Sequence, residues 1–217
     1  MIIETLSVGL LQCNCTVLGC GETRRALVID PGDEADRILD VIGRHKLTVE
    51  AILQTHAHLD HLGATCAVAR STGAPVLLHP GDRYLYDHAE LQAQLFGLPK
   101  IETAEIGREV QDGETLRIGA LRGKILHTPG HSPGSLCLAV SESGPNDAAK
   151  PAYILSGDTL FCGSIGRTDL WGGDMDLILN SIRKRLLPYP DATVVVPGHG
   201  PATTIGAERA TNPFLAP

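Results

Sequence analysis

Residues 53–63 read Leu-Gln-Thr-His-Ala-His-Leu-Asp-His-Leu-Gly and hold four side chains that bind metals well, His56, His58, Asp60 and His61. The apolar run before them, residues 49–53, predicts a buried strand, and the residues after them predict a helix. Side chains two positions apart on an extended end point the same way, so His56 and His58 can face one point. Imidazole and carboxylate groups are the ligands of zinc and other first-row metals. The stretch therefore predicts a metal site rather than a solvated histidine-rich loop.

Three further candidate ligands each follow a short apolar strand and have a glycine as neighbour, namely His131, Asp158 and His199. Glycine permits sharp turns and close backbone approach, so side chains from several strand ends can converge on an ion. One metal takes three or four protein ligands, and seven ligands therefore favour two metals with a shared ligand. The division that we prefer gives one metal His56, His58 and His131, gives the other Asp60, His61 and His199, and makes Asp158 the bridge.

Length and composition set the class of protein. The 217 residues suit a single domain spanning 1–217, and 43% hydrophobic residues are enough for a core. A formal net charge of −7 without a Lys/Arg run argues against nucleic acid as a partner. We expect a cytoplasmic protein with no membrane contact, because neither a signal peptide nor an apolar run of ~20 residues is present. The oligomeric state does not follow from the sequence.

The six cysteines form no Cys-x-x-Cys pair and mostly lie in apolar contexts. This pattern predicts reduced, buried thiols. A disulfide among Cys13, Cys15 and Cys20 stays open at this point.

Apolar periodicity predicts the order of strands and helices. Strands are expected at 2–8, 15–18, 26–29, 49–53, 76–78, 122–127, 136–140, 153–155 and 194–196. We expect a helix capped by Asp33, a second from about Leu62 to Gly73, and an amphipathic third over 174–187. Residues 81–107 predict a helical excursion beside the site, and residues 141–150 predict a surface loop.

Four segments resemble the metal-binding motifs of the metallo-β-lactamase superfamily. They are Thr-His-Ala-His-Leu-Asp-His (55–61), Pro-Gly-His-Ser-Pro-Gly (129–134), Ser-Gly-Asp-Thr-Leu-Phe (156–161) and Pro-Gly-His-Gly (197–200). The resemblance covers nearly the whole chain. It implies an α/β fold, the four-layer αβ/βα sandwich, with a two-metal site at the edge between the sheets.

Within that superfamily, Gly-Asp-Thr-Leu-Phe followed by Gly-Arg-Thr-Asp (166–169) is similar to glyoxalase II, hydroxyacylglutathione hydrolase. Only 18 residues follow His199, which matches the short form without the helical C-terminal domain. The resemblance implies hydrolysis of S-lactoylglutathione or a related small acyl thioester by a metal-bound hydroxide. It also implies two divalent metal ions, zinc by preference with iron or manganese as alternatives. Strict glutathione specificity is not expected, because the missing domain holds much of the glutathione site.

The resemblance also implies roles for individual residues. Asp60 would ligate a metal and orient the hydroxide, and Asp158 would bridge, so both are expected to be catalytic. Arg167 matches a basic position that contacts the glutathione part of the substrate in relatives, and a guanidinium suits carboxylates. An ion pair with Asp169 is the structural alternative for this arginine. Among the remaining histidines, His127 is the best candidate to support a ligand.

Other functional classes were weighed against the hydrolase. The persulfide (sulfur) dioxygenase branch holds a single iron with two histidines and an aspartate, and it shares the Gly-Arg-Thr-Asp segment. That branch usually lacks Pro-Gly-His-Gly, so it ranks second. A metal-free binding module is disfavoured because all seven ligands are intact. β-Lactam hydrolysis is expected at most as a weak side reaction.

Overall fold

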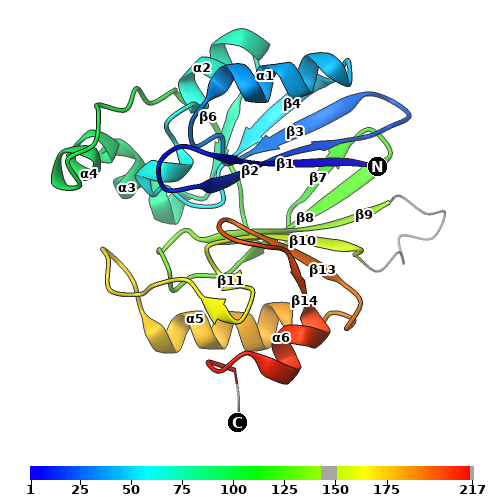
Figure 1. Cartoon of the computed structure of the whole chain (residues 1–217), viewed down its shortest axis with the longest axis vertical. Coiled ribbons are helices and arrows are strands. Elements are labelled where there is room, and N and C mark those ends of the chain that lie inside the picture. The colour runs from blue at the N-terminus through cyan, green and yellow to red at the C-terminus, as the bar shows by residue number, and fades with distance from the viewer. Residues whose placement is uncertain (143–150, 216–217) are drawn as a thin grey trace.

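Two facing six-stranded sheets form the centre of the molecule (Figure 1). The computed structural model describes residues 1–142 and 151–215. The first sheet has its strands in chain order, β1 (Ile2–Val8), β2 (Cys13–Gly19), β3 (Arg25–Ile29), β4 (Thr48–Leu53), β5 (Val76–Leu78) and β6 (Ile106–Glu109). The second sheet has the order β14 (Thr203–Thr204), β13 (Val194–Pro197), β10 (Tyr153–Gly157), β9 (Leu136–Glu142), β8 (Leu121–His127) and β7 (Thr115–Ile118). A small third sheet pairs β11 (Leu160–Phe161) with β12 (Ser164–Ile165).

Helices cover the outer face of each large sheet (Figure 1). The first sheet carries α1 (Ala35–Arg44) and α2 (Thr65–Thr72). The second carries α5 (Met175–Ser181), the π-helical turn η3 (Ile182–Leu186) and α6 (Ile205–Thr211). One end of the molecule holds α3 (Arg83–Asp87) and α4 (Ala89–Leu95), as Figure 1 shows. The short turns η1 (Leu59–His61) and η2 (Pro80–Asp82) contact these two helices. The layers run helix, sheet, sheet, helix, and the predicted αβ/βα sandwich is confirmed.

The continuous apolar runs in the sequence arise because each large sheet is buried on both faces. Strand β9 shows the alternation that this requires, since successive side chains on a strand point to opposite faces. Leu136, Leu138 and Val140 face the core between the sheets. Cys137 and Ala139 face the α5–α6 layer instead. A strand whose residues are all apolar thus buries its side chains in two hydrophobic layers, one on each face of the sheet.

Strand direction places the loops that carry the candidate ligands. Strands β3, β4 and β5 are parallel, and β10 is parallel to β13. The two large sheets meet at one edge, where Cys13 of β2 makes an isolated bridge with His199 after β13. Parallel strands end at the same edge of a sheet, so polar residues that follow them gather there.

The predicted strands are confirmed with shifts of a few residues at their ends, and residues 81–107 do contain helices. Two helix starts were wrong. Glu34, with φ +54°, precedes α1, while Asp33 instead accepts a hydrogen bond from the Glu34 amide at 2.6 Å. The helix expected from Leu62 begins at Thr65, because the ligand segment first forms η1.

The C-terminal half shows three more differences from prediction. The helix expected over 174–187 is α-helical only to Ser181 and then widens into η3, while β14 and α6 had not been predicted. Residues 141–142 extend β9, and the rest of the loop expected over 141–150 lies outside the described residues.

All six cysteines are free, so no disulfide joins Cys13, Cys15 and Cys20. In the described parts of the chain, we find no helix with the length and apolar character of a membrane span.

Candidate metal centre

All seven predicted ligands lie together at the edge between the sheets. His56 and His58 follow β4, and Asp60 and His61 form part of η1. The other three are delivered by loops of the second sheet, after β8 (His131), after β10 (Asp158) and after β13 (His199). The structure therefore combines one continuous segment of the first sheet with three separate segments of the second.

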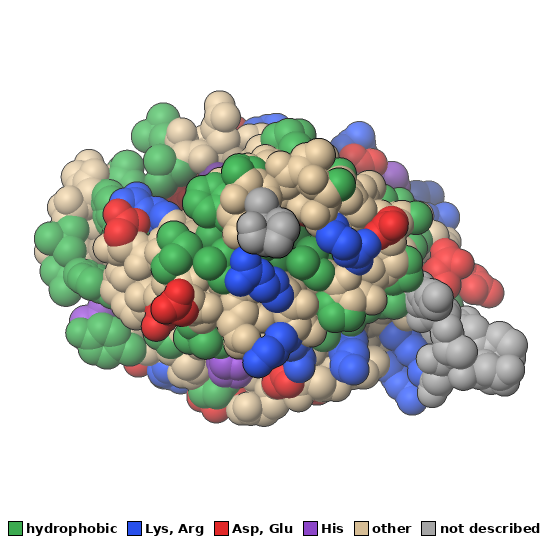
Figure 2. All heavy atoms as spheres, turned by 90° about the horizontal axis from the view of Figure 1, so that it is seen from below, with side chains coloured by type: hydrophobic (Ala, Val, Ile, Leu, Met, Phe, Trp, Pro, Cys, Tyr) green, Lys and Arg blue, Asp and Glu red, His purple; other side chains and the backbone are tan. Residues whose placement is uncertain are grey.

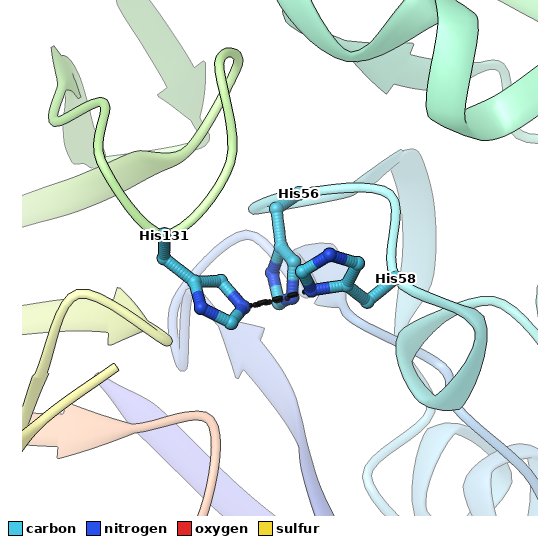
Figure 3. A group of neighbouring side chains, drawn as sticks. All are labelled: His56, His58 and His131. Atoms are coloured by element: carbon cyan, nitrogen blue, oxygen red, sulfur yellow. Dashed lines mark hydrogen bonds between the residues drawn. The ribbon is translucent and has the colours of Figure 1, made fainter. Parts of the chain in front are cut away.

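The first group consists of His56, His58 and His131, whose side chains point toward one another (Figure 3). All three are buried. Nε2 of His131 lies 2.8 Å from Nδ1 of His58 and 3.2 Å from Nε2 of His56. Three imidazole nitrogens at these separations can surround one small cation.

The hydrogen bonds on the far side of two rings show which nitrogens are bare. Nδ1 of His131 lies 2.7 Å from the carbonyl oxygen of Arg167, so Nδ1 carries the proton and donates. Thr55 donates its hydroxyl proton to Asp30 at 2.6 Å, and its oxygen therefore accepts from Nδ1 of His56 at 3.1 Å. With these assignments, Nε2 of His131 and Nε2 of His56 carry no proton, and their lone pairs face each other.

Two facing lone pairs repel unless a positive charge lies near both. A proton is disfavoured there, because burial and the neighbouring imidazoles hold the pKa of His56 well below its usual value. Burial likewise lowers the pKa of His58 to about 3. The donor set of the first group therefore fits a metal cation better than it fits protons.

The second group consists of Asp60, His61 and His199. Nε2 of His199 lies 3.0 Å from Oδ2 of Asp60 and 3.3 Å from Nε2 of His61. Burial alone would lower the pKa of His61, but Cys13 and the nearby carboxylates raise it well above its usual value. The carboxylates that favour a proton on this ring would equally favour a divalent cation beside it.

Asp158 lies between the two groups. Its Oδ2 is 3.6 Å from Nε2 of both His131 and His199, and its Oδ1 is 3.5 Å from Nε2 of His61. The Oδ1 atom is buried without a hydrogen-bond partner. Buried carboxylate oxygens are normally partnered, so this one fits a ligand to a cation. A Cβ at Gly198 would overlap Oδ1, and only glycine allows this approach.

Asp30 holds the two groups in place and had not been singled out from the sequence. It is buried and accepts from the Thr55 amide at 2.7 Å, the Thr55 hydroxyl and Nδ1 of His61 at 3.0 Å. Asp30, His56 and His61 also lie close enough to form a third metal-binding group. The carboxylate accepts three hydrogen bonds from the segment that carries the ligands, so Asp30 acts as a positioning residue. The available signal was an aspartate at the end of a buried strand parallel to β4.

Asp82 joins the two loops that carry the first group, and it was also missed. Its buried carboxylate accepts from the Ala57 amide at 2.9 Å, the Ser132 hydroxyl at 2.7 Å and the Gly134 amide at 2.5 Å. Burial raises the pKa of Asp82. Ala57 lies between His56 and His58, and Ser132 follows His131, so one carboxylate fixes both sides of the group.

His127 does not occupy the supporting position that we expected. Its ring stacks on His79 at a centroid distance of 4.0 Å, and its Nε2 donates to the Pro133 carbonyl oxygen at 2.9 Å. The supporting role belongs to Asp30 and Asp82 instead, because these two carboxylates contact the ligand loops directly.

The two groups open into one cavity of about 390 Å³. Asp60, Asp158 and His199 line it, together with apolar side chains that include Phe161 and Ile165. Arg167 also lines it, but its exposed guanidinium forms a bidentate pair with Asp169 at 2.7 and 2.8 Å. One cavity large enough for a small substrate is therefore lined by candidate metal ligands and by the guanidinium of Arg167.

Asp30→Asn is expected to weaken metal binding roughly 10- to 100-fold, the usual effect of losing a partner that orients a ligand. The amide offers one oxygen acceptor where the carboxylate has two, so the Thr55 amide contact at Oδ1 cannot persist together with the Thr55 hydroxyl and His61 contacts at Oδ2. Titration against a competing chelator measures the affinity. The control is Asp36→Asn on the exposed face of α1. An unchanged metal affinity in Asp30→Asn would remove Asp30 from the supporting shell.

A family model and the similar sequences agree on one family for this chain. A family model described as "Metallo-beta-lactamase superfamily" matches residues 8–199. Hydroxyacylglutathione hydrolase GloC of Haemophilus influenzae is 39% identical over 217 residues, covering 99% of this chain and 98% of that protein.

Solved structures with high similarity carry several different names. BLEG-1, titled a B3 metallo-beta-lactamase, has a TM-score of 0.86 and 38% identity with complete coverage of both chains. TTHA1623 in a di-iron-bound form has a TM-score of 0.85 and 40% identity, covering 98% of this chain and 100% of that one. ETHE1 from Myxococcus xanthus has a TM-score of 0.79 and 27% identity, covering 98% and 84%.

Proposed function

The chain belongs to the metallo-beta-lactamase superfamily, and from that premise we propose that it hydrolyses small acyl thioesters with two divalent metal ions. The observation that carries the proposal is the position of Asp158 between two groups of three ligands, with a buried oxygen that has no other partner. This arrangement favours a pair of metals over a single one. The similarity to GloC supports a thioester as the substrate.

His56, His58 and His131 would hold one metal, and Asp60, His61 and His199 would hold the other, with Asp158 shared. When bound, two such cations supply Lewis acidity and lower the pKa of water from 15.7 to about 7. Zinc suits these ligands, and iron or manganese does as well. The di-iron form of TTHA1623 makes iron a specific alternative.

Asp60 is suited to orient the attacking water. Its side chain lines the cavity, and Oδ2 lies 3.0 Å from Nε2 of His199. Burial alone would raise the pKa of Asp60, but His61 and His199 hold it well below its usual range. A carboxylate that stays ionised accepts a hydrogen bond well but is a weak base. Asp60 therefore fixes the direction of attack without removing the proton itself.

Arg167 is proposed to bind a carboxylate on the thiol half of the substrate. The guanidinium lines the cavity, and its present partner Asp169 is exposed. An exposed ion pair contributes little net free energy, because solvent screens it. A substrate carboxylate can therefore replace Asp169 on the same guanidinium.

Arg167→Ala is expected to raise KM for S-lactoylglutathione about tenfold, an effect typical of losing a charge-assisted contact. Metal content should not change, because His131 bonds the backbone oxygen of residue 167, which alanine keeps. Asp169→Ala is the matched variant and should lower KM, since it frees the guanidinium for substrate. Steady-state kinetics of both variants measure the effect. Equal rises in KM for both variants, or loss of metal in Arg167→Ala, would make the pair structural.

Two other activities have a specific observation in their favour. The similarity to ETHE1 supports the single-iron persulfide dioxygenase that the sequence had placed second. The similarity to BLEG-1 supports β-lactam hydrolysis. Both activities would use the same cavity, so they are separated by reaction and by metal count rather than by location.

One set of parallel assays tests the proposal. Purified protein of known metal content is given S-lactoylglutathione, a glutathione persulfide with oxygen uptake recorded, and a β-lactam. Thioester hydrolysis with two metals per chain is the expected result. Oxygen uptake with one iron per chain would establish the dioxygenase, and turnover of only the β-lactam would establish a lactamase.

A further inference from the structure

A side pocket of about 130 Å³ opens beside His58. It is lined by His58, Gln92, Leu95, Phe96, Leu170 and Trp171. Four of these residues, His58, Gln92, Phe96 and Leu170, also line the main cavity. The pocket is thus a side chamber of the candidate centre, and we call it the apolar annex.

The annex offers little to a charged or strongly polar group. Its lining includes no Asp, Glu, Lys or Arg. The one amide, Gln92, is buried and spends its Nε2 on the carbonyl oxygens of Ala57 at 2.9 Å and Leu85 at 2.8 Å. The remaining walls are aromatic and aliphatic.

The apolar walls of the annex are exposed to solvent. Phe96 is 53% exposed and Trp171 is 44% exposed, although both are large hydrophobic side chains. Figure 2 shows hydrophobic side chains gathered at the left end of the molecule, the end where Figure 1 places α3 and α4. Apolar surface left open beside a reactive centre marks a binding surface for an apolar group.

A second side chamber, of about 270 Å³, adjoins the main cavity at other residues. Its lining is also largely apolar, but it includes Asp33, Asp60 and Lys100, so its walls carry charges that the annex lacks. It joins the main cavity at Leu11, Leu59 and Asp60. The uncharged chamber thus adjoins the first ligand group through His58, and the charged chamber adjoins the second group through Asp60.

From this asymmetry we propose that the annex receives the acyl chain, and that the substrates are thioesters of apolar acyl groups several carbons long. The inference rests on the proposed thioester hydrolysis and narrows its substrate class. A lactoyl group is too short and too polar to use the annex. Burial of each methylene should raise kcat/KM about fourfold until the annex is filled.

The test uses N-acetylcysteamine thioesters of acetate, butanoate, hexanoate and octanoate with the metal-loaded protein. The carrier is the same in every substrate and has no charge, so differences in rate come from the acyl chain alone. We expect kcat/KM to rise at least tenfold from acetyl to hexanoyl. Phe96→Ala and Trp171→Ala should each reduce the hexanoyl-to-acetyl ratio several-fold. A flat series in the unmodified protein would overturn the proposal.

Phe214→Ala is the matched control for Phe96→Ala. Phe214 is 42% exposed, similar to Phe96, and it lines neither the main cavity nor the annex. Its variant should keep the hexanoyl-to-acetyl ratio. If Phe214→Ala and Phe96→Ala changed the ratio equally, the annex would have no role in selecting the acyl chain.

A binding measurement separates failure of the annex from failure of the hydrolase. Trp171 is the single tryptophan of the chain, so its fluorescence reports on the annex alone. Non-hydrolysable alkyl thioethers of N-acetylcysteamine, methyl to octyl, are titrated into the metal-loaded protein. Affinity that rises with alkyl length supports the annex, and affinity independent of length overturns it. If neither this series nor S-lactoylglutathione is hydrolysed, the proposed function is wrong, and this titration alone decides the annex.

Discussion

Asp158→Ala is expected to deplete both metals and to lower thioester hydrolysis at least about a thousandfold. Asp158 lies within 3.6 Å of ligand nitrogens in both groups, His131 on one side and His61 and His199 on the other. Its loss leaves two groups of three ligands with no shared carboxylate. Metal ions contribute several kcal/mol to such reactions, and each 1.36 kcal/mol is a factor of ten in rate. Metal analysis and kcat/KM on the same sample measure both effects.

A control and a contrary result define this test. Asp176→Ala, in the first turn of α5, removes an exposed carboxylate and should leave metal content and rate unchanged. An Asp158→Ala protein that folds, keeps two metals and hydrolyses thioesters normally would refute the bridging role. Full activity of the unmodified protein with a single metal would refute the two-metal proposal and favour the single-iron alternative.

His131→Ala and His199→Ala should each lower activity by orders of magnitude but deplete different metals. The two histidines belong to separate groups, His131 with His56 and His58, and His199 with Asp60 and His61. We expect His131→Ala to lose metal chiefly from the first group and His199→Ala chiefly from the second. Metal counting and absorption spectra of the cobalt-substituted variants distinguish the two groups, since the first has only nitrogen ligands besides Asp158.

The matched control is His88→Ala, which removes a half-buried histidine that stacks on Tyr84. It should keep both metals. Identical cobalt spectra for His131→Ala and His199→Ala would show that both histidines hold the same ion. The third group, Asp30, His56 and His61, would then have to be considered as a binding site.

The candidate ligands could be predicted because each stands at a recognisable place in the sequence. His56, His131 and His199 each follow an apolar strand, His131 and His199 also have a glycine as neighbour, and strand ends at one edge of a fold converge. Their number and chemistry then indicated metal. The four-layer sandwich followed from the same motifs through their resemblance to a known family.

Asp30 and Asp82 could not be predicted in the same way, because their roles depend on contacts distant in sequence. Asp82 accepts from Ser132 and Gly134, fifty and fifty-two positions later. Asp30 meets Thr55 and His61 only when β3 and β4 pair. Nothing local distinguishes a carboxylate that supports a ligand loop from one that ends a strand in a turn.

The displaced start of α2 has a similar cause. Local pattern placed the helix at Leu62, where apolar residues begin to recur with helical spacing. The backbone oxygen of Asp60 instead packs so closely against Gly32 that a Cβ there would overlap it. This tertiary contact fixes η1 before the helix, a result that periodicity does not encode.

The bridge between Cys13 and His199 has a consequence for the order in which the chain is made. The first group is complete in sequence once His131 has been synthesised. The second group needs His199, which reaches the edge only after β13 has paired with β10. The chain is synthesised from its N-terminus at about 5–20 residues per second. A nascent chain would therefore present the first group before the second, and the pair of groups would be finished only after nearly the whole chain has left the ribosome.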